Sequence, residues 1–147
     1  MLSASGFGDV ALQCFFKSEC FSFVTGDDFS SLANERLDDA TALLSTERYA
    51  GAVYMCGYAV EFALKARICK FLGWDEFRDD YRDLKTHNLE ALFNFTGLGG
   101  VKASFAGYWN DVIDWKPEIR YHAGVKVTRQ MAEGMISSTN KLMEVLL

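Results

Sequence analysis

Residues 47–74 read ERYAGAVYMCGYAVEFALKARICKFLGW, a run in which small and apolar side chains recur at helical spacing. These side chains cover most of the circumference of a helix rather than one stripe, which indicates a central, largely buried helix. Glu61 interrupts the apolar run. A carboxylate in such a place needs a cationic or hydrogen-bonding partner, or it stays protonated. Lys65 lies one helical turn further on and is the local candidate for that partner.

The composition of the chain predicts an all-α fold. Half of the 147 residues are apolar, which is enough for one good core, and there is a single proline. We expect an up-and-down bundle of four to five helices over residues 29–147, preceded by a poorly defined segment, 1–28, that docks on the domain or on a partner chain. The formal net charge of -5 argues against a general nucleic-acid coat protein but is compatible with a local basic face.

Turn and cap residues divide the domain into segments. Asp27 or Asp28 can cap the first helix, and Gly73 can end the central one. The first half of the domain is expected to hold a helix over 29–46, the central helix, a charged and exposed segment over 74–86, and a helix that starts at His87 or Asn88. The second half is expected to hold a short helix over 102–113 with Tyr108 inward, a segment over 114–124 that is irregular or one turn of helix, and a last helix over 126–147 with Met131 on its apolar side.

The sequence also disfavours several classes of protein. Two histidines and four cysteines show no metal-ligand spacing, so we expect no metal and no other cofactor. No stretch reaches the roughly 20 uninterrupted apolar residues of a membrane span, and the N-terminus lacks the basic region of a signal peptide. We therefore expect a cytoplasmic protein with reduced thiols and no membrane contact.

Three segments carry a resemblance to a known family. They are GAVYMCGYAVEFALKARI in the central helix, the following THNLEAL, and DWKPEIRYHAG before the last helix. In this combination the chain resembles the HEPN domain, the nucleotide-binding helical domain of higher eukaryotes and prokaryotes, over roughly Phe29 to Leu147. The resemblance implies a helical bundle that is usually dimeric. Many members are ribonucleases of toxin–antitoxin or phage-defence systems, others pair with a minimal nucleotidyltransferase, and others only bind RNA or nucleotides.

The family's active motif is an Arg, four to six residues of any kind and then a His at the start of the last helix, with a polar residue of the central helix nearby. Arg120 and Glu61 match this pattern, but the expected histidine positions, 125 to 127, hold none, and His122 follows Arg120 by only two residues. This departure argues against the family's metal-independent catalysis. The same spacing occurs at Arg82 and His87, which we interpret as a chance pair because it precedes the third helix.

Two interpretations of Arg120 remain open. In the first, Arg120 and His122 face one cleft, where a histidine can take the 2′-hydroxyl proton of RNA and an arginine can stabilise the phosphorane charge. In the second, Arg120 neutralises the buried Glu61, and His122 is a surface or dimer-interface residue. Trp115 can likewise stack on a base or belong to the core. The residues that we assign to ligand binding on either interpretation are Lys116, Tyr121, Lys126, Arg129, Tyr58 and Lys65.

The leading hypothesis is a HEPN-like domain that dimerises and binds RNA, a nucleotide or a protein partner, in a toxin–antitoxin or defence context. A nucleotidyltransferase or an antitoxin is the expected protein partner. The sequence leaves open whether the protein is an enzyme. The alternatives are a metal-independent endoribonuclease that uses Arg120, His122 and Glu61, and a purely structural interaction domain whose aromatic N-terminal segment binds the partner.

Overall fold

The computed structural model describes residues 24–121, 124 and 126–147, and in this part of the chain the fold is all-α, as predicted. The long helices are α2 (Gly26–Ser45), α3 (Tyr49–Leu72) and α6 (Arg129–Leu146). Shorter elements join α3 to α6, namely α4 (Leu89–Phe93), the 3-10 helix η2 (Gly99–Phe105), α5 (Ala106–Val112) and the 3-10 helix η3 (Pro117–Tyr121). Residues 1–23, on which the predicted docking of the N-terminal segment falls, lie outside the described part.

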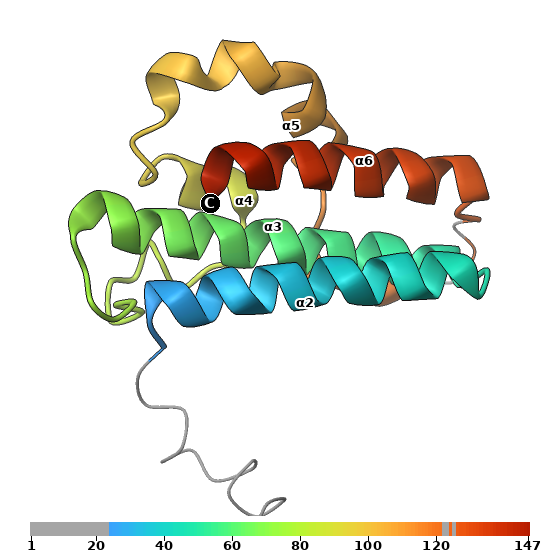
Figure 1. Cartoon of the computed structure of the whole chain (residues 1–147), viewed down its shortest axis with the longest axis horizontal. Coiled ribbons are helices and arrows are strands. Elements are labelled where there is room, and N and C mark those ends of the chain that lie inside the picture. The colour runs from blue at the N-terminus through green and yellow to red at the C-terminus, as the bar shows by residue number, and fades with distance from the viewer. Residues whose placement is uncertain (1–23, 122–123, 125) are drawn as a thin grey trace, which may run out of the picture.

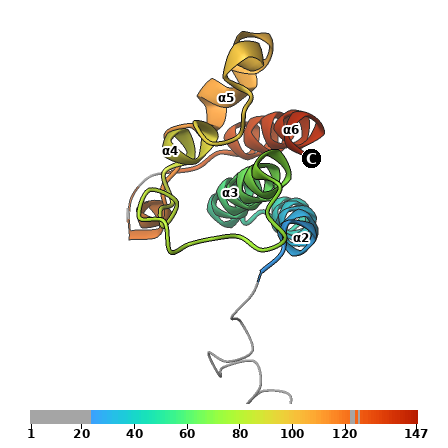
Figure 2. The ribbon, with the colours of Figure 1, turned by 90° about the vertical axis from the view of Figure 1, so that its left-hand side faces the viewer.

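Helix α3 is the centre of the bundle, as its apolar circumference predicted. It packs against α2, α4, η3 and α6, and the end-on view shows it between α2 and α6 (Figure 2). Helix α2 runs antiparallel to α3, whereas α6 runs in the same direction as α3 (Figure 1). Two contacts agree with the parallel arrangement, because Arg129 reaches Glu47 at one end of the helix pair and Lys70 reaches the Leu147 carbonyl oxygen at the other.

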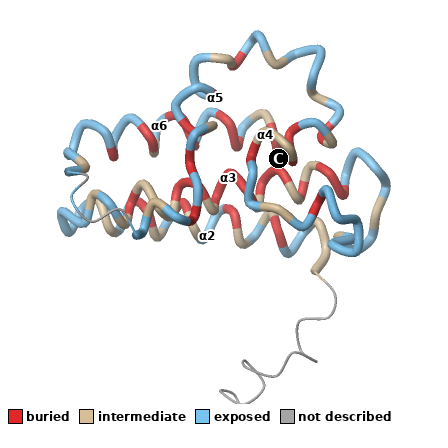
Figure 3. The backbone as a smooth tube through the Cα atoms, turned by 180° about the vertical axis from the view of Figure 1, so that it is seen from behind, coloured by how far each residue is buried: buried red, intermediate tan, exposed pale blue. Residues whose placement is uncertain are grey.

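The core follows the inner faces of these helices, where the buried residues gather in Figure 3. Fully buried members include Ala33, Val60, Leu64, Ile68, Leu92, Val112 and Leu142. Trp115 is 4% exposed, so the structure places it in the core rather than on a ligand-binding surface. Its ring lies against Gly57 of α3, where a Cβ atom would overlap three ring atoms. A glycine at this position therefore lets the indole approach the helix backbone.

The helix ends differ in detail from the sequence-based expectation. Thr25, not Asp27 or Asp28, is the N-cap of α2, and Asp28 completes a capping box with it. The central helix begins at Tyr49 rather than at Glu47, because Glu47 has a φ of 60° and belongs to the turn that precedes the helix. Gly73 ends α3 in the left-handed conformation, as predicted.

Two further expectations are corrected in the second half of the chain. The helix expected over 102–113 is a 3-10 helix followed by α5, and Tyr108, expected to point inward, is 41% exposed. The last helix starts at Arg129, and Met131 is 54% exposed although we placed it on the apolar side. In the described part of the segment over 114–124, residues Pro117–Tyr121 form a short 3-10 helix, in agreement with the expected irregular segment or single turn of helix.

Candidate functional site

The buried carboxylate of Glu61 has two partners. Its side chain is 1% exposed, and it accepts a hydrogen bond of 2.7 Å from the Lys65 Nζ. Its other oxygen lies 2.9 Å from Nδ1 of His87, a residue 26 positions along the chain. The local pair with Lys65 is therefore confirmed. Two partners explain how the apolar run accommodates an acid, because a buried carboxylate loses several kcal/mol of hydration unless it is paired.

Lys65 is enclosed together with the acid. Helical spacing sets its ammonium over the carboxylate one turn earlier, and the side chain is only 15% exposed. The ammonium also lies 5.7 Å from the ring centroid of Phe29 and 5.5 Å from that of Phe77. These contacts satisfy the positive charge within the fold, so the ligand-binding role predicted for Lys65 gains no support from its surroundings.

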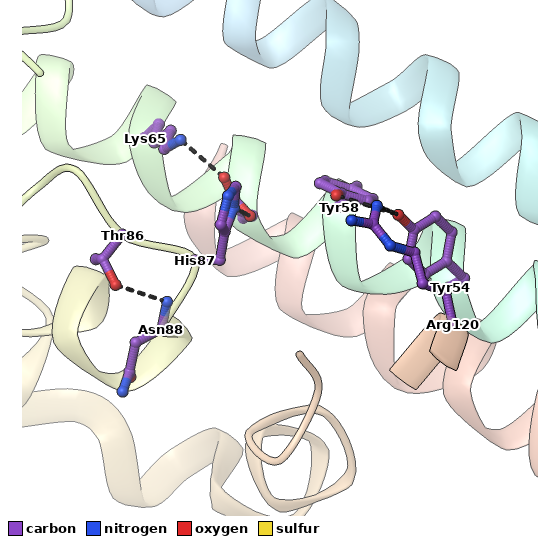
Figure 4. Close-up of polar contacts among 8 residues, drawn as sticks. Tyr54, Tyr58, Lys65, Thr86, His87, Asn88 and Arg120 are labelled. Carbon is purple, nitrogen blue, oxygen red and sulfur yellow. Dashed lines mark hydrogen bonds and ion pairs between the residues drawn. The ribbon is translucent and has the colours of Figure 1, made fainter. Parts of the chain in front are cut away.

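His87 is held at the junction between the charged segment and α4 (Figure 4). The next residue, Asn88, is the N-cap of α4 and accepts a hydrogen bond from the Ala91 N–H at 3.0 Å. The Asn88 N–H donates in turn to the Thr86 hydroxyl at 3.0 Å. This turn fixes the backbone on both sides of His87. The imidazole therefore meets Glu61 from a defined direction while 58% of its side chain stays exposed.

Arg120 does not neutralise Glu61, and the predicted pair between them is wrong. The guanidinium of Arg120 donates to the Tyr54 hydroxyl at 3.0 Å (Figure 4). Tyr54 precedes Glu61 by seven residues, about 10 Å along a helix, so η3 meets α3 too far from the acid. The guanidinium also lies over the Tyr121 ring, 4.8 Å from its centroid. The hydrogen bond that Arg120 donates to the Tyr54 hydroxyl raises the pKa of Arg120, which keeps the guanidinium fully charged.

Tyr58 lies between the Glu61–His87 contact and the Tyr54–Arg120 contact. Its hydroxyl lies 3.3 Å from that of Tyr54, and its ring packs edge-on against His87 at a centroid distance of 6.3 Å. Burial raises the pKa of Tyr58 to about 12, the Tyr54 hydrogen bond and the charge of Glu61 act in the same direction, and Arg120 opposes them. Tyr58 is therefore a neutral phenol at physiological pH. His87 and Arg120 lie on either side of it along one face of α3.

The remaining residues predicted to bind a ligand are more scattered. Lys116, Tyr121 and Lys126 are exposed. Arg129 lies within ion-pair distance of Glu47 and Glu133, at 3.4 and 3.7 Å, and its guanidinium is 5.4 Å from the Tyr49 ring centroid. His122, which we paired with Arg120 as a catalytic candidate, lies outside the described residues, so that pairing stays a prediction.

Two cavities border His87. The smaller, of about 220 Å³, lies toward α2 and is lined by Phe29, Lys65, Phe77, Asp79 and Lys85, among others. The larger, of about 400 Å³, lies toward η3 and has Lys85, Asn88, Trp115, Lys116 and Glu118 in its wall. A third cavity, of about 280 Å³, contains Tyr54 and Arg120 in a mostly apolar wall. There is thus space for a ligand both beside His87 and beside Arg120.

Three other features of the described residues concern metal binding, thiols and membrane insertion. Within the described ranges no group of three or more His, Cys, Asp or Glu side chains could hold a metal ion. Cys56 and Cys69 of α3 are free and buried thiols. None of the helices in the described residues has both the length and the apolar character that a membrane crossing requires.

A comparison with protein families identifies a matching family. The model of the HEPN domain matches residues 28–147, well over half of the chain. The chain therefore belongs to the HEPN domain family, in agreement with its helical bundle and with the resemblance in its sequence. This membership makes it a helical domain of a nucleotide- and RNA-related family whose members often dimerise. Comparisons with curated proteins and with solved structures find no match.

Sequence reasoning identified Glu61 and Arg120 but assigned them to each other, and it dismissed the residue that actually meets Glu61. Two signals pointed to His87. It immediately precedes an N-capping asparagine, and it is the only histidine in the sequence that follows an arginine with four residues between the two. Neither signal could show that the segment after α3 folds back along that helix, because this path depends on tertiary contacts such as the bond from the Phe77 N–H to the Val24 carbonyl.

Proposed function

We propose that this domain binds single-stranded RNA along the face of α3 that carries Tyr54 and Tyr58, where Arg120 of η3 lies against the helix. The phosphate backbone would pair with Arg120 and with the exposed cations of the η3 region, and a base would stack on the exposed ring of Tyr121. Binding of this kind combines a cationic track with aromatic side chains and does not require sequence-specific contacts.

The state of Arg120 carries the proposal. Among the described residues no carboxylate lies within ion-pair distance of its guanidinium, which is held by a neutral hydroxyl instead. A hydroxyl orients the group without cancelling its charge. Arginine presents a planar fork of N–H donors that matches phosphate oxygens, so the donors left free after the bond to Tyr54 can bind an anion from solvent.

The neighbouring residues support the same chemistry. Lys116 precedes Arg120 by four residues and Lys126 follows it by six. Both lysines are exposed. Tyr121 is 70% exposed. A planar aromatic surface beside a guanidinium is suited to a nucleobase joined to its phosphate. This local basic and aromatic face stands out within a chain whose formal net charge is -5.

Fluorescence anisotropy with a labelled single-stranded RNA, in the presence of a chelator, tests the proposal. Arg120→Ala should weaken binding about tenfold or more, because hydrogen bonds to charged groups contribute roughly 1.5–3 kcal/mol. Tyr54→Phe removes the orienting hydroxyl but keeps the charge, so its loss should be smaller. Arg36→Ala is the matched control, because Arg36 lies on α2 and pairs with Glu35 and Asp39. Equal affinities for wild type and Arg120→Ala would refute the proposal.

We further propose that the domain acts as a homodimer in a toxin–antitoxin or defence system. Family membership supports this proposal, since HEPN domains often dimerise. Light scattering after size exclusion should give the mass of two chains. A gene for a nucleotidyltransferase or an antitoxin beside the gene for this chain would identify the partner. If the protein binds neither RNA nor nucleotides, the structural interaction domain becomes the better hypothesis.

A further inference from the structure

We propose that the cavity between α4 and η3 binds a short acidic segment of a partner protein, which inserts one apolar side chain and pairs its carboxylates with lysines at the rim. The cavity has a volume of about 400 Å³ and is lined by residues 85–89, 113 and 115–118. Neither Tyr54 nor Arg120 belongs to this lining. The inference therefore goes beyond the proposed RNA binding and does not depend on it.

The buried part of the lining is apolar and already in place. Leu89 and Trp115 belong to the core, Pro117 is buried, and Ile113 packs against the core from a half-buried position. Trp115 is fixed against α3, and the Asn88 cap holds the start of α4 on the other side of the cavity. An apolar side chain can therefore enter and displace water without a rearrangement of the domain, which keeps the cost of binding low.

Two lysines bring positive charge to the rim from separate stretches of the chain. Lys85 precedes α4 and Lys116 precedes η3, and both are exposed. In the part of the chain that the structure describes, no carboxylate lies within ion-pair distance of either ammonium group. Thr86 and His87 add a hydroxyl and an exposed imidazole to the same wall (Figure 4). Carboxylates that flank the inserted side chain can thus pair with cations that have no partner of their own.

The charges around the cavity favour a peptide over a nucleic acid. Glu118 lies in the wall beside Lys116. The stretch over 75–85 carries five acids against three cations, namely Asp75, Glu76, Asp79, Asp80 and Asp83 against Arg78, Arg82 and Lys85. A continuous phosphate backbone would meet these carboxylates with repulsion. A peptide can place its few carboxylates beside the two lysines and offer backbone N–H groups to Glu118, so a protein segment matches this site better.

Selection of random peptides displayed on phage against the full chain tests the proposal. The enriched peptides should share an apolar residue with an acidic residue close to it in sequence, and Lys85→Glu should fail to enrich them. A labelled synthetic peptide of the enriched sequence is then titrated by fluorescence anisotropy. Replacing its apolar residue by serine should weaken binding about tenfold or more. No enrichment, or enriched peptides without acidic residues, would overturn the proposal.

Charge reversal measures what the rim contributes. Lys85→Glu should weaken the enriched peptide about tenfold, because a repulsion replaces an attraction. A peptide whose acidic residue is replaced by lysine should bind Lys85→Glu more tightly than it binds the wild type, a result that an unfolded variant cannot give. Lys141→Glu is the matched control, because Lys141 lies on α6 and pairs with Glu144. This variant should bind the original peptide as the wild type does.

Two variants separate this site from the RNA-binding face, with which it shares Lys116. Arg120→Ala should leave peptide binding unchanged, and Lys85→Ala should leave RNA binding unchanged. Peptide binding that falls in Arg120→Ala but not in Lys85→Glu would place the peptide on the RNA-binding face and overturn the proposal. RNA binding that falls in Lys85→Ala, without any enriched peptide, would assign the cavity to RNA and also overturn it. A wild type that binds the peptide but no RNA would refute only the proposed function.

Discussion

The close approach of Trp115 to Gly57 makes a strong test of the packing behind the candidate site. Gly57 lies in the middle of α3, and a Cβ built there falls within 3.0 Å of three atoms of the Trp115 ring, a separation that real Cβ atoms essentially never show. The ring has few directions in which to yield. It is 4% exposed and packs edge-on against Tyr58 at a centroid distance of 5.0 Å. Gly57→Ala should therefore displace the indole from its position.

The size of the effect follows from two opposing contributions. Losing the packing of a large buried aromatic residue costs about 3–5 kcal/mol in core truncations. Replacing glycine by alanine inside a helix recovers about 1 kcal/mol. We expect Gly57→Ala to lower the free energy of unfolding by about 2–4 kcal/mol. Because Trp115 also packs against Tyr54 at 6.3 Å, the same change should loosen the support of Arg120 and weaken RNA binding.

Urea denaturation of Gly57→Ala and Gly134→Ala measures the difference. Gly134 lies in the interior of α6 with nothing within 4 Å of an added Cβ. The control should therefore show only the helical gain and unfold at higher urea than the wild type. If both variants are stabilised to the same extent, the indole does not lie against Gly57, and the described packing of α3 is wrong.

Three further predictions concern single groups. Hydrogen bonding to Lys102 lowers the pKa of Glu90 below its ordinary value of 4.5. The stability that this carboxylate contributes is therefore present above pH 4.5 and is lost as the pH falls through the folded-state pKa. Glu90→Gln should flatten the acid unfolding curve. Burial raises the pKa of Cys56 to about 11, so peptide mapping after iodoacetamide treatment at pH 8 should show this thiol alkylated only in denaturant. Asn88→Ala removes the cap of α4 and should lower the free energy of unfolding in urea by about 1 kcal/mol.

The fold was predictable where local signals were strong. The apolar circumference of residues 49–72 identified α3 as the central helix, and Gly73 marked its end. Local signals failed where two residues competed for one role. Thr25 took the N-cap of α2 because Asp28 could then bind the Thr25 N–H from the N3 position. The helix expected over 102–113 began as a 3-10 helix at Gly99, a distinction that apolar spacing does not resolve.

The candidate site was predictable only in part. An acidic residue in an apolar helix predicts a cationic or hydrogen-bonding partner. The local partner, Lys65, could be found from helical spacing alone. The second partner could not be found in this way. His87 reaches Glu61 because the segment after Gly73 folds back over α3, with Phe77 packed edge-on against Phe29 at 5.3 Å. Such a path is set by tertiary contacts, and no short motif encodes it.

The salt dependence of RNA binding tests the central claim, a guanidinium kept available for phosphate by the Tyr54 hydroxyl, most directly. Each phosphate neutralised on a single strand contributes about −0.7 to the slope of log K against log salt concentration. The slope for Arg120→Ala should be shallower than that of the wild type by about 0.7, and the slope for Arg36→Ala should be unchanged. Identical slopes for wild type and Arg120→Ala would show that Arg120 meets no phosphate and would contradict the account.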